Sequence, residues 1–163
     1  MSLRNDLERV ASDHWENERV KIKPLETEAD LIYAAYECEL TDEQRELVSP
    51  VWFYVGRAYL FPQDFFPCII HNESDERIGF INFGKWFGSN AYTWGYFIDK
   101  HFQGKGYGRA AARLAIQILK EANPEMPIKL ATEESNLKAQ KLYASLGFKR
   151  LDEKDGDDLV FGL

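Results

Sequence analysis

The feature that most constrains this chain is a glycine-rich loop that runs directly into a helix. The loop reads Q-G-K-G-Y-G from Gln103 to Gly108, and apolar residues recur at helical spacing from Arg109 to Glu121. An aromatic-rich strand, Tyr92 to Ile98, precedes the loop. Alternating glycines permit positive φ angles, and a helix N-terminus offers free N–H groups at the positive end of its dipole. The pattern therefore predicts an anion-binding turn between a strand and a helix.

Two common nucleotide-binding loops do not fit these residues. A GxGxxG fingerprint that begins at Gly104 requires glycine at the position of Arg109. A Walker A loop requires Gly-Lys followed by Ser or Thr, whereas Lys105 is followed by Gly106. The turn is therefore expected to belong to a different anion-binding motif.

The remaining pattern predicts one α/β domain. Helices are expected from Thr27, from Thr41 with a break near Pro50, from Arg109 and from Asn136 to Leu146. Strands are expected at 20–25, 66–71, 77–83, 92–98, 128–132, 148–151 and 159–163. This order predicts a mixed central sheet of about seven strands in a domain over residues 20–163. Residues 1–19 are dominated by charge and are predicted to be a loosely attached extension.

Composition narrows the classes of function. The chain has 163 residues, a net charge of −7 and a pI near 5.0, which disfavours nucleic acid as a partner. Cys38 and Cys68 form no CxxC pair, so neither a disulfide scaffold nor a metal site is expected. No apolar run approaches the roughly 20 residues that span a bilayer, and no signal peptide is apparent. A cytoplasmic protein without a membrane partner is the expectation.

A second motif follows the first at a distance of about 30 residues. From Asn136 the chain reads N-L-K-A-Q-K-L-Y-A-S-L-G-F, and Asn136 and Tyr143 lie two helical turns apart, on nearly the same face. Together with Gln103, Gly106 and Gly108, this segment resembles the two cofactor motifs of the GNAT family of N-acetyltransferases. The expected order of elements from Val20 to Leu163 is also similar to that family's single-domain fold.

The resemblance implies acetyl-CoA as cofactor, with the pyrophosphate on the backbone of the glycine loop. It implies that Asn136 contacts the pantetheine arm and that Tyr143 is the catalytic residue, whose hydroxyl stands near the thioester sulfur. The cofactor-binding residues implied are Phe97, Ile98, Gln103, Gly104, Lys105, Gly106, Tyr107, Gly108, Arg109, Asn136 and Tyr143. Taken alone, Asn136 also fits a simple N-cap and Tyr143 a packed aromatic.

The strand before the loop departs from many relatives. They carry Glu or Asp there as base or amine anchor, whereas this strand has no acid until Asp99. A water relay or solvent is then expected to remove the proton of an amine whose pKa is about 10.4. Backbone N–H groups near Phe97, Ile98 and Asp99 are the expected donors to an oxyanion, and Gly95 is expected to form a bulge that leaves such groups unpaired.

Charge is divided unequally along the chain. Residues 26–46 hold eight acids and one arginine, whereas residues 97–121 have a net charge of +3. The first segment is expected to attract a cationic amine and the second an anionic cofactor. The segment from Leu40 to Gly84 also resembles bacterial diamine and spermidine acetyltransferases. Glu37, Glu39 and Trp94 are the expected acceptor-binding residues.

Three functions remain open from the sequence. The first is acetyl transfer to a polyamine or other small cationic amine by direct attack in a ternary complex. The second keeps the cofactor and changes the acceptor to an amino sugar, an antibiotic or a protein N-terminus. The third is a catalytically silent acyl-CoA-binding module. Because members of the family are often dimers, the resemblance also implies a homodimer.

Overall fold

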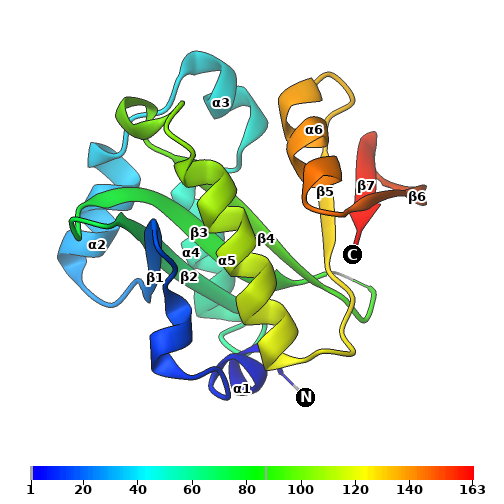
Figure 1. Cartoon of the computed structure of the whole chain (residues 1–163), viewed down its shortest axis with the longest axis horizontal. Coiled ribbons are helices and arrows are strands. Elements are labelled where there is room, and N and C mark those ends of the chain that lie inside the picture. Colours follow the sequence, from blue (N-terminus) through cyan, green and yellow to red (C-terminus); the bar gives the residue numbers. More distant parts are fainter. Residues whose placement is uncertain (1, 87) are drawn as a thin grey trace.

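An antiparallel sheet of four strands forms the centre of the computed structural model, which describes residues 2–86 and 88–163 (Figure 1). In spatial order its strands are β1 (Val20–Pro24), β2 (Phe65–Asn72), β3 (Arg77–Lys85) and β4 (Tyr92–Ile98). Each strand pairs with the next one in sequence. Strand β3 is buried along all but its two end residues, as expected of a strand whose sheet is covered on both faces.

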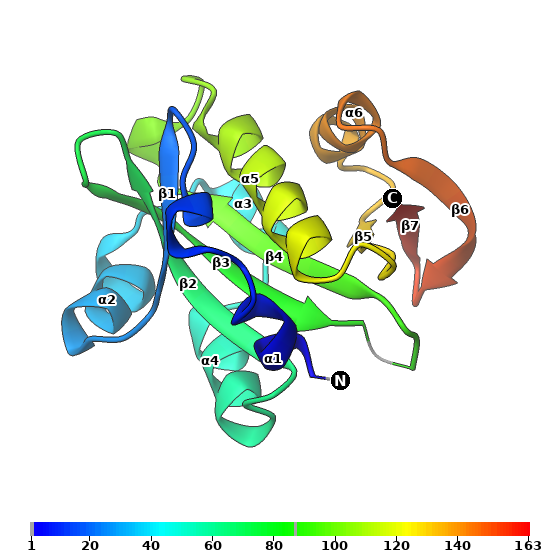
Figure 2. The same ribbon diagram turned by 60° about the horizontal axis from the view of Figure 1, so that its bottom comes forward.

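Helices cover both faces of this sheet. Helix α5 (Tyr107–Ala122) crosses one face and helix α4 (Val51–Leu60) lies on the other (Figure 2). The buried side of α5 follows helical spacing and contains Ala111, Leu114, Ala115, Ile118, Leu119 and Ala122. The helix begins two residues earlier than its apolar pattern predicts, because Gly106 provides the cap and Tyr107 already contributes to the core.

A second sheet of three strands carries the C-terminal part of the chain. Its order is β5 (Lys129–Thr132), β7 (Asp158–Gly162) and β6 (Lys149–Asp155), and helix α6 (Leu137–Ser145) lies beside it. The two sheets meet at an isolated parallel bridge between Tyr92 and Ile128. Beyond this bridge β4 and β5 diverge (Figure 1). The α/β fold and the seven strands are thus confirmed within the described residues, with the strands divided between two sheets.

Short helices follow β1 and carry the acidic segment. They are α2 (Glu28–Ile32), the π-helical turn η2 (Tyr33–Glu37) and α3 (Asp42–Leu47). Thr27 and Thr41 each form a capping box with the residue three positions on, as the sequence predicts. The predicted break near Pro50 is also present: α3 ends at Leu47, and Pro50 occupies the position just before α4.

The loose attachment predicted for residues 1–19 is wrong for those the structure describes, which exclude Met1. Helix α1 (Leu3–Leu7) and the 3₁₀ helix η1 (Ser12–Trp15) pack beside α5. Leu3, Leu7 and Val10 belong to the main hydrophobic core. The buried Asp6 carboxylate accepts hydrogen bonds from Tyr92 Oη and Asn123 Nδ2. The segment is therefore part of the support for α5.

Candidate active site

The glycine loop leaves the N-terminus of α5 open. Gly104 and Gly106 have φ angles of 74° and 86°, in the left-handed region that favours glycine. Gly106 occupies the N-cap position without a side-chain cap, and the N–H of Ala110 is the first to reach its carbonyl, at 3.1 Å. The N–H groups of Tyr107, Gly108 and Arg109 therefore have no acceptor within the helix. An uncapped end of a 16-residue helix fits an anionic group such as a pyrophosphate.

Gln103 fixes the loop to the end of β4. Its Nε2 donates to the carbonyl oxygen of Ile98 at 2.9 Å and to Oε1 of Gln44 at 2.6 Å. Gln44 belongs to α3, where the same oxygen accepts the N–H of Thr41 at 3.1 Å. The side chain of Gln103 is thus an anchor, and it joins the acidic helix α3 to the cofactor loop. The sequence gives no signal for this pair because the two residues are 59 positions apart.

Basic side chains surround the loop, and one of them comes from the N-terminal segment. Arg19 donates from Nη2 to the carbonyl of Lys105 at 2.9 Å and stacks at 4.6 Å over the ring of Tyr107. The Tyr107 hydroxyl donates to Glu73, so the ring is held to the turn between β2 and β3. On the other side, Arg109 donates to Ser145 of α6 at 2.5 Å. Sequence reasoning missed Arg19 because it lies far from the motif.

Strand β4 presents unpaired backbone groups where the two sheets diverge. The N–H of Asp99 donates to Ile78, which sets the alternation of the antiparallel ladder with β3. By this alternation the N–H of Phe97 points toward β3, whereas the N–H groups of Tyr96 and Ile98 point toward the edge of β4 that diverges from β5. Of the predicted residues Phe97, Ile98 and Asp99, only Ile98 therefore directs its N–H into this space.

The bulge predicted at Gly95 is wrong. The register between β3 and β4 is continuous from the Gly79–Ile98 pair to the Lys85–Tyr92 pair. Glycine is needed at this position for another reason: a Cβ there would overlap the hydroxyl of Tyr54 from α4. The rings of Tyr54 and Phe80 pack at a tilt with their centroids 5.6 Å apart, and burial raises the pKa of the Tyr54 hydroxyl. The free N–H groups of β4 thus result from the divergence of the two sheets. Tyr54 approaches the same part of β4 from the face that α4 covers.

Helix α6 carries the second pair of predicted residues. Oδ1 of Asn136 accepts the N–H of Ala139 at 3.1 Å, so this residue is the N-cap of the helix. The ring of Tyr143 packs 5.9 Å from Phe148 and 5.8 Å from Phe161. Burial, and after it the electrostatic interaction with the neighbouring Tyr54 hydroxyl, raises the pKa of the Tyr143 hydroxyl to about 12. This hydroxyl therefore remains protonated at neutral pH.

The carboxylate of Asp99, directly after β4, is engaged in several hydrogen bonds. Asp99 accepts the N–H of Glu39 at 3.0 Å, and both the N–H and Nδ1 of His101 at 2.8 Å. Burial alone would raise its pKa, but these hydrogen bonds and the charge of His101 hold the pKa below the usual range. A carboxyl group with this environment is a poor base. Asp99 therefore ties the chain around Glu39 to the strand exit.

The structure does not bring the three predicted acceptor residues together. Glu39 forms an ion pair with Lys100 at 3.1 Å. Glu37 lines a separate cavity of about 590 Å³ beside the turn between β2 and β3. Trp94 is buried on the α5 face, 6.0 Å from Phe148. The larger cavity, of about 830 Å³, lies between the N-terminal segment, β1 and α4, away from the glycine loop.

Comparisons with known proteins agree with this arrangement. The model of the acetyltransferase (GNAT) family matches residues 28–148. A protein of Bacillus subtilis subsp. natto (strain BEST195), named "Probable spermine N(1)-acetyltransferase", is 42% identical over 60 residues. That match covers 37% of this chain and 40% of the relative, so it spans less than half the length of either protein.

Solved structures match over most of the chain. An acetyltransferase from Agrobacterium tumefaciens str. C58 superposes with a TM-score of 0.70 at 18% identity, covering 91% of this chain and 92% of the other. Aminoglycoside acetyltransferase AAC(6')-Ib, solved in complex with coenzyme A, gives 0.69 at 22% identity over 88% and 92%. At these identities the likeness concerns the fold. Among the described residues, no helix is long and apolar enough to cross a membrane.

Proposed function

This chain belongs to the GNAT family of acetyltransferases, which use acetyl-CoA, and we propose that it transfers the acetyl group to a primary amine of a small polycation, in the manner of a polyamine acetyltransferase. The observation that carries the proposal is the uncapped N-terminus of α5 beside the open edge of β4. The acetyltransferase domain would comprise residues 20–163, with residues 2–19 bracing α5.

The glycine loop would hold the cofactor through its backbone. The N–H groups of Tyr107, Gly108 and Arg109 would donate to a phosphate at the helix end, where Lys105 and Arg19 add positive charge. Gly104 and Gly106 allow the close approach, and Gln103 holds the loop in place. Asn136 at the start of α6 would meet the pantetheine arm. Acetyl-CoA supplies the thioester carbon that an amine attacks and the thiolate that leaves.

Two backbone N–H groups and one hydroxyl would act on the reacting atoms. The N–H of Ile98, with that of Tyr96, lies on the open edge of β4 and is the donor proposed for the acyl oxygen. The Tyr143 hydroxyl, protonated because its pKa is about 12, is the donor proposed for the departing sulfur. Tyr54 would border the reaction site from the face of the sheet that α4 covers, where its hydroxyl lies against Gly95.

The amine would lose its proton to water. Strand β4 contains no carboxylate, and the lowered pKa of Asp99 makes that group a weak acceptor for a proton. The attacking amine must be neutral, and its pKa in water is about 10.4. The rate at saturating cofactor is therefore expected to rise with pH across the neutral range.

Electrostatics favour a polycation as acceptor. Exposed carboxylates of the acidic segment form no ion pair with any described residue: Glu26, Glu28, Glu37, Glu43 and Glu46. Two of them lie on α3, which Gln44 joins to the cofactor loop. The negative potential of these carboxylates near the end of β4 would attract an amine with several positive charges more strongly than an amine with one. The partial match to a spermine acetyltransferase supports the same class.

An amine panel tests the function. The protein is incubated with acetyl-CoA and spermine, spermidine, a monoamine, an aminoglycoside or an N-terminal peptide, and thiol release is followed. Spermine or spermidine should give the largest kcat/KM. Preference for the aminoglycoside or the peptide would reject the polyamine assignment, and cofactor binding without turnover of any amine would reject the enzyme assignment.

A charge variant tests the acceptor side. Glu43→Gln combined with Glu46→Gln should raise KM for spermine severalfold and leave KM for a monoamine nearly unchanged. Glu125→Gln combined with Asp157→Asn, which removes two exposed carboxylates beyond the end of α5 and in the turn between β6 and β7, is the matched control for loss of charge. Equal effects in the two proteins would show that only the overall charge matters.

A further inference from the structure

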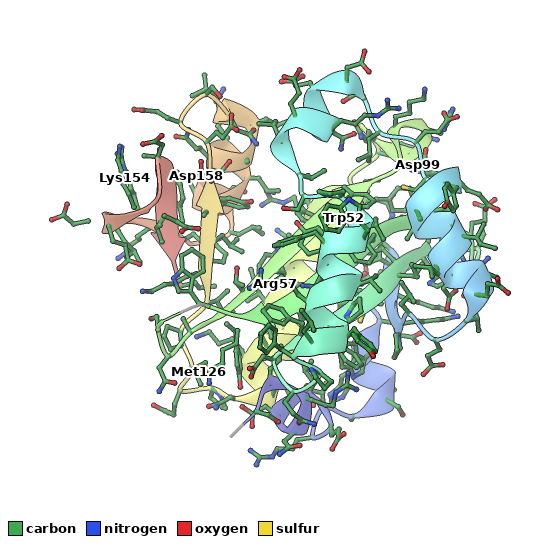
Figure 3. The ribbon with its side chains drawn as sticks, turned by 180° about the vertical axis from the view of Figure 1, so that it is seen from behind. Trp52, Arg57, Asp99, Met126, Lys154 and Asp158 are labelled. Carbon is green, nitrogen blue, oxygen red and sulfur yellow. The ribbon has the colours of Figure 1, made fainter. Side chains whose placement is uncertain are left out.

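Strand β4 lacks one side chain on the face that helix α4 covers. Phe97 belongs to the hydrophobic cluster on this face, and by the alternation of a strand Gly95 lies on the same face. The missing side chain is one residue before Tyr96, whose N–H is on the free edge of β4. Figure 3 shows this face of the first sheet, with Trp52 and Arg57 labelled on α4.

The hydroxyl of Tyr54 fills the space above Gly95. A Cβ at Gly95 would overlap this hydroxyl and would lie 3.0 Å from the ring carbon that carries it. The Tyr54 ring packs against Phe80, which in turn stacks on Phe97 with the ring centroids 5.4 Å apart. A phenol oxygen from α4 is therefore fixed against the backbone of β4, in the place that a β4 side chain would otherwise occupy.

This hydroxyl has a lone pair to spare. Ser49, in the turn before α4, interacts with the Tyr54 hydroxyl through both its side chain and its backbone. A phenol hydroxyl has one proton and two lone pairs. With the proton on the Ser49 side chain and one lone pair on the Ser49 N–H, the second lone pair is available to another donor. Burial raises the pKa of the hydroxyl, so the oxygen offers this lone pair as a neutral group.

Tyr54 also lies near the hydroxyl that is proposed for the departing sulfur. Tyr54 comes from α4 and Tyr143 from α6, and the two hydroxyls are close enough for an electrostatic interaction. In the tetrahedral intermediate the sulfur and the attacking nitrogen are bonded to the same carbon. The groups that bind these two atoms must therefore lie close together, as Tyr54 and Tyr143 do.

We propose that the Tyr54 hydroxyl positions the attacking amine, because its second lone pair accepts a hydrogen bond from an N–H of the acceptor above Gly95. The lone pair of the nitrogen is then directed at the thioester carbon, and the proton that the nitrogen must lose still passes to water. This assignment rests on the proposed function and deepens it, since it names the group that binds the acceptor nitrogen.

Tyr54→Phe tests the role of the hydroxyl. The variant keeps the ring contacts and should fold. Its kcat for spermine should fall about ten- to a hundredfold, because the nitrogen is no longer directed at the thioester carbon. Both KM for spermine and Kd for coenzyme A should change little, since neither depends mainly on this oxygen. Tyr59→Phe, at a residue of the same helix that is 85% exposed, is the matched control and should retain the wild-type kcat.

Gly95→Ala tests the position of the hydroxyl. Its Cβ should displace the Tyr54 hydroxyl and lower kcat about as much as Tyr54→Phe does. In the Tyr54→Phe protein the same change should cost much less, because the displaced group is already absent. Gly84→Ala on β3, whose Cβ would lie 3.0 Å from the ring of Phe65, is the control for strain in the sheet and should leave kcat unchanged.

Two results would overturn the assignment. One is a wild-type kcat in Tyr54→Phe, and the other is a full additive loss when Gly95→Ala is combined with it. Calorimetric titration with coenzyme A separates loss of the hydroxyl from loss of the fold, since every variant should bind the cofactor as the wild type does. A wild-type protein that acetylates no amine would reject the proposed function and this role with it, whereas an active wild type with an equally active Tyr54→Phe would reject this role alone.

Discussion

The two helices of the candidate cofactor site are supported very differently. Helix α5 buries eight residues and contacts the first sheet and the N-terminal segment. Helix α6 has no fully buried residue, and only Tyr143 and, after its end, Leu146 pack against the core. The end of the site that would bind phosphate is therefore fixed by the core itself. The end that would meet the thioester rests on a few aromatic contacts.

This difference follows from what each helix must do. Backbone N–H groups at a helix end bind an anion only where the end is held in place, because they act through their direction. Arg19 and Gln103 fix that end from two sides. Tyr143 acts through one hydroxyl at the end of a long side chain, which its neighbours Phe148 and Phe161 orient. A rigid helix is therefore less necessary at α6.

The largest expected effect concerns stability. Leu114→Ala on α5 removes a fully buried side chain and should lower the free energy of unfolding by about 2–5 kcal/mol. Leu137→Ala on α6 removes a side chain that is 63% exposed and should change it by less than about 0.5 kcal/mol. Urea denaturation measures both. Similar losses would mean that α6 is as much a part of the core as α5.

The second prediction concerns cofactor affinity. Gly106→Val forces a β-branched residue into a φ angle of 86° and should displace the helix end, raising the Kd for coenzyme A by about a hundredfold, or 2.7 kcal/mol. Gly156→Val, at a φ angle of 60° in the turn between β6 and β7, carries a similar strain far from the loop. Its Kd should remain unchanged in calorimetric titration. Wild-type affinity in Gly106→Val would remove α5 as the anion site.

The third prediction concerns turnover. Tyr143→Phe should lower kcat by about ten- to a hundredfold with little change in the Kd for coenzyme A, because only the transition state loses a donor. The pKa of about 12 keeps the wild-type hydroxyl protonated, so kcat should show no decline from this group below about pH 11. Tyr36→Phe, on the exposed η2 turn, is the control. An unchanged kcat would assign Tyr143 to packing alone.

Local signals made much of this architecture predictable. The turn between β4 and α5, both capping boxes and the bounds of β4 depend on residues close in sequence, and these structural predictions are confirmed. The division into two sheets was not predictable, because it depends on where β4 and β5 diverge in space. The roles of Gly95 and Gln44 could not be predicted for the same reason. Gly95 lies against Tyr54 and Gln44 bonds to Gln103, and both partners are far away in sequence.

Sequence reasoning also missed the N-terminal segment, although its signal was present. Leu3, Leu7 and Val10 follow helical spacing, but the charged residues between them dominate the composition. Burial of Asp6 could not be read from that pattern, since its partner Tyr92 is 86 positions away. The roles proposed for the site residues on α5 and α6 remain predictions, to be tested by the variants above.

The smallest expected effect tests how the N-terminal segment supports α5. His14 Nδ1 lies 2.8 Å from Glu121 in the last turn of α5, and the hydrogen bond and charge of Glu121 raise the pKa of His14 above 6.5. A raised pKa in the folded state means that the contribution to stability is full below the unfolded pKa, about 6.5, and disappears as pH rises through the folded value. The Tm of His14→Gln should therefore lie slightly below that of the wild type near pH 6 and equal it near pH 9. A difference that is the same at both pH values would show that His14 stabilises α5 by packing and not by its charge.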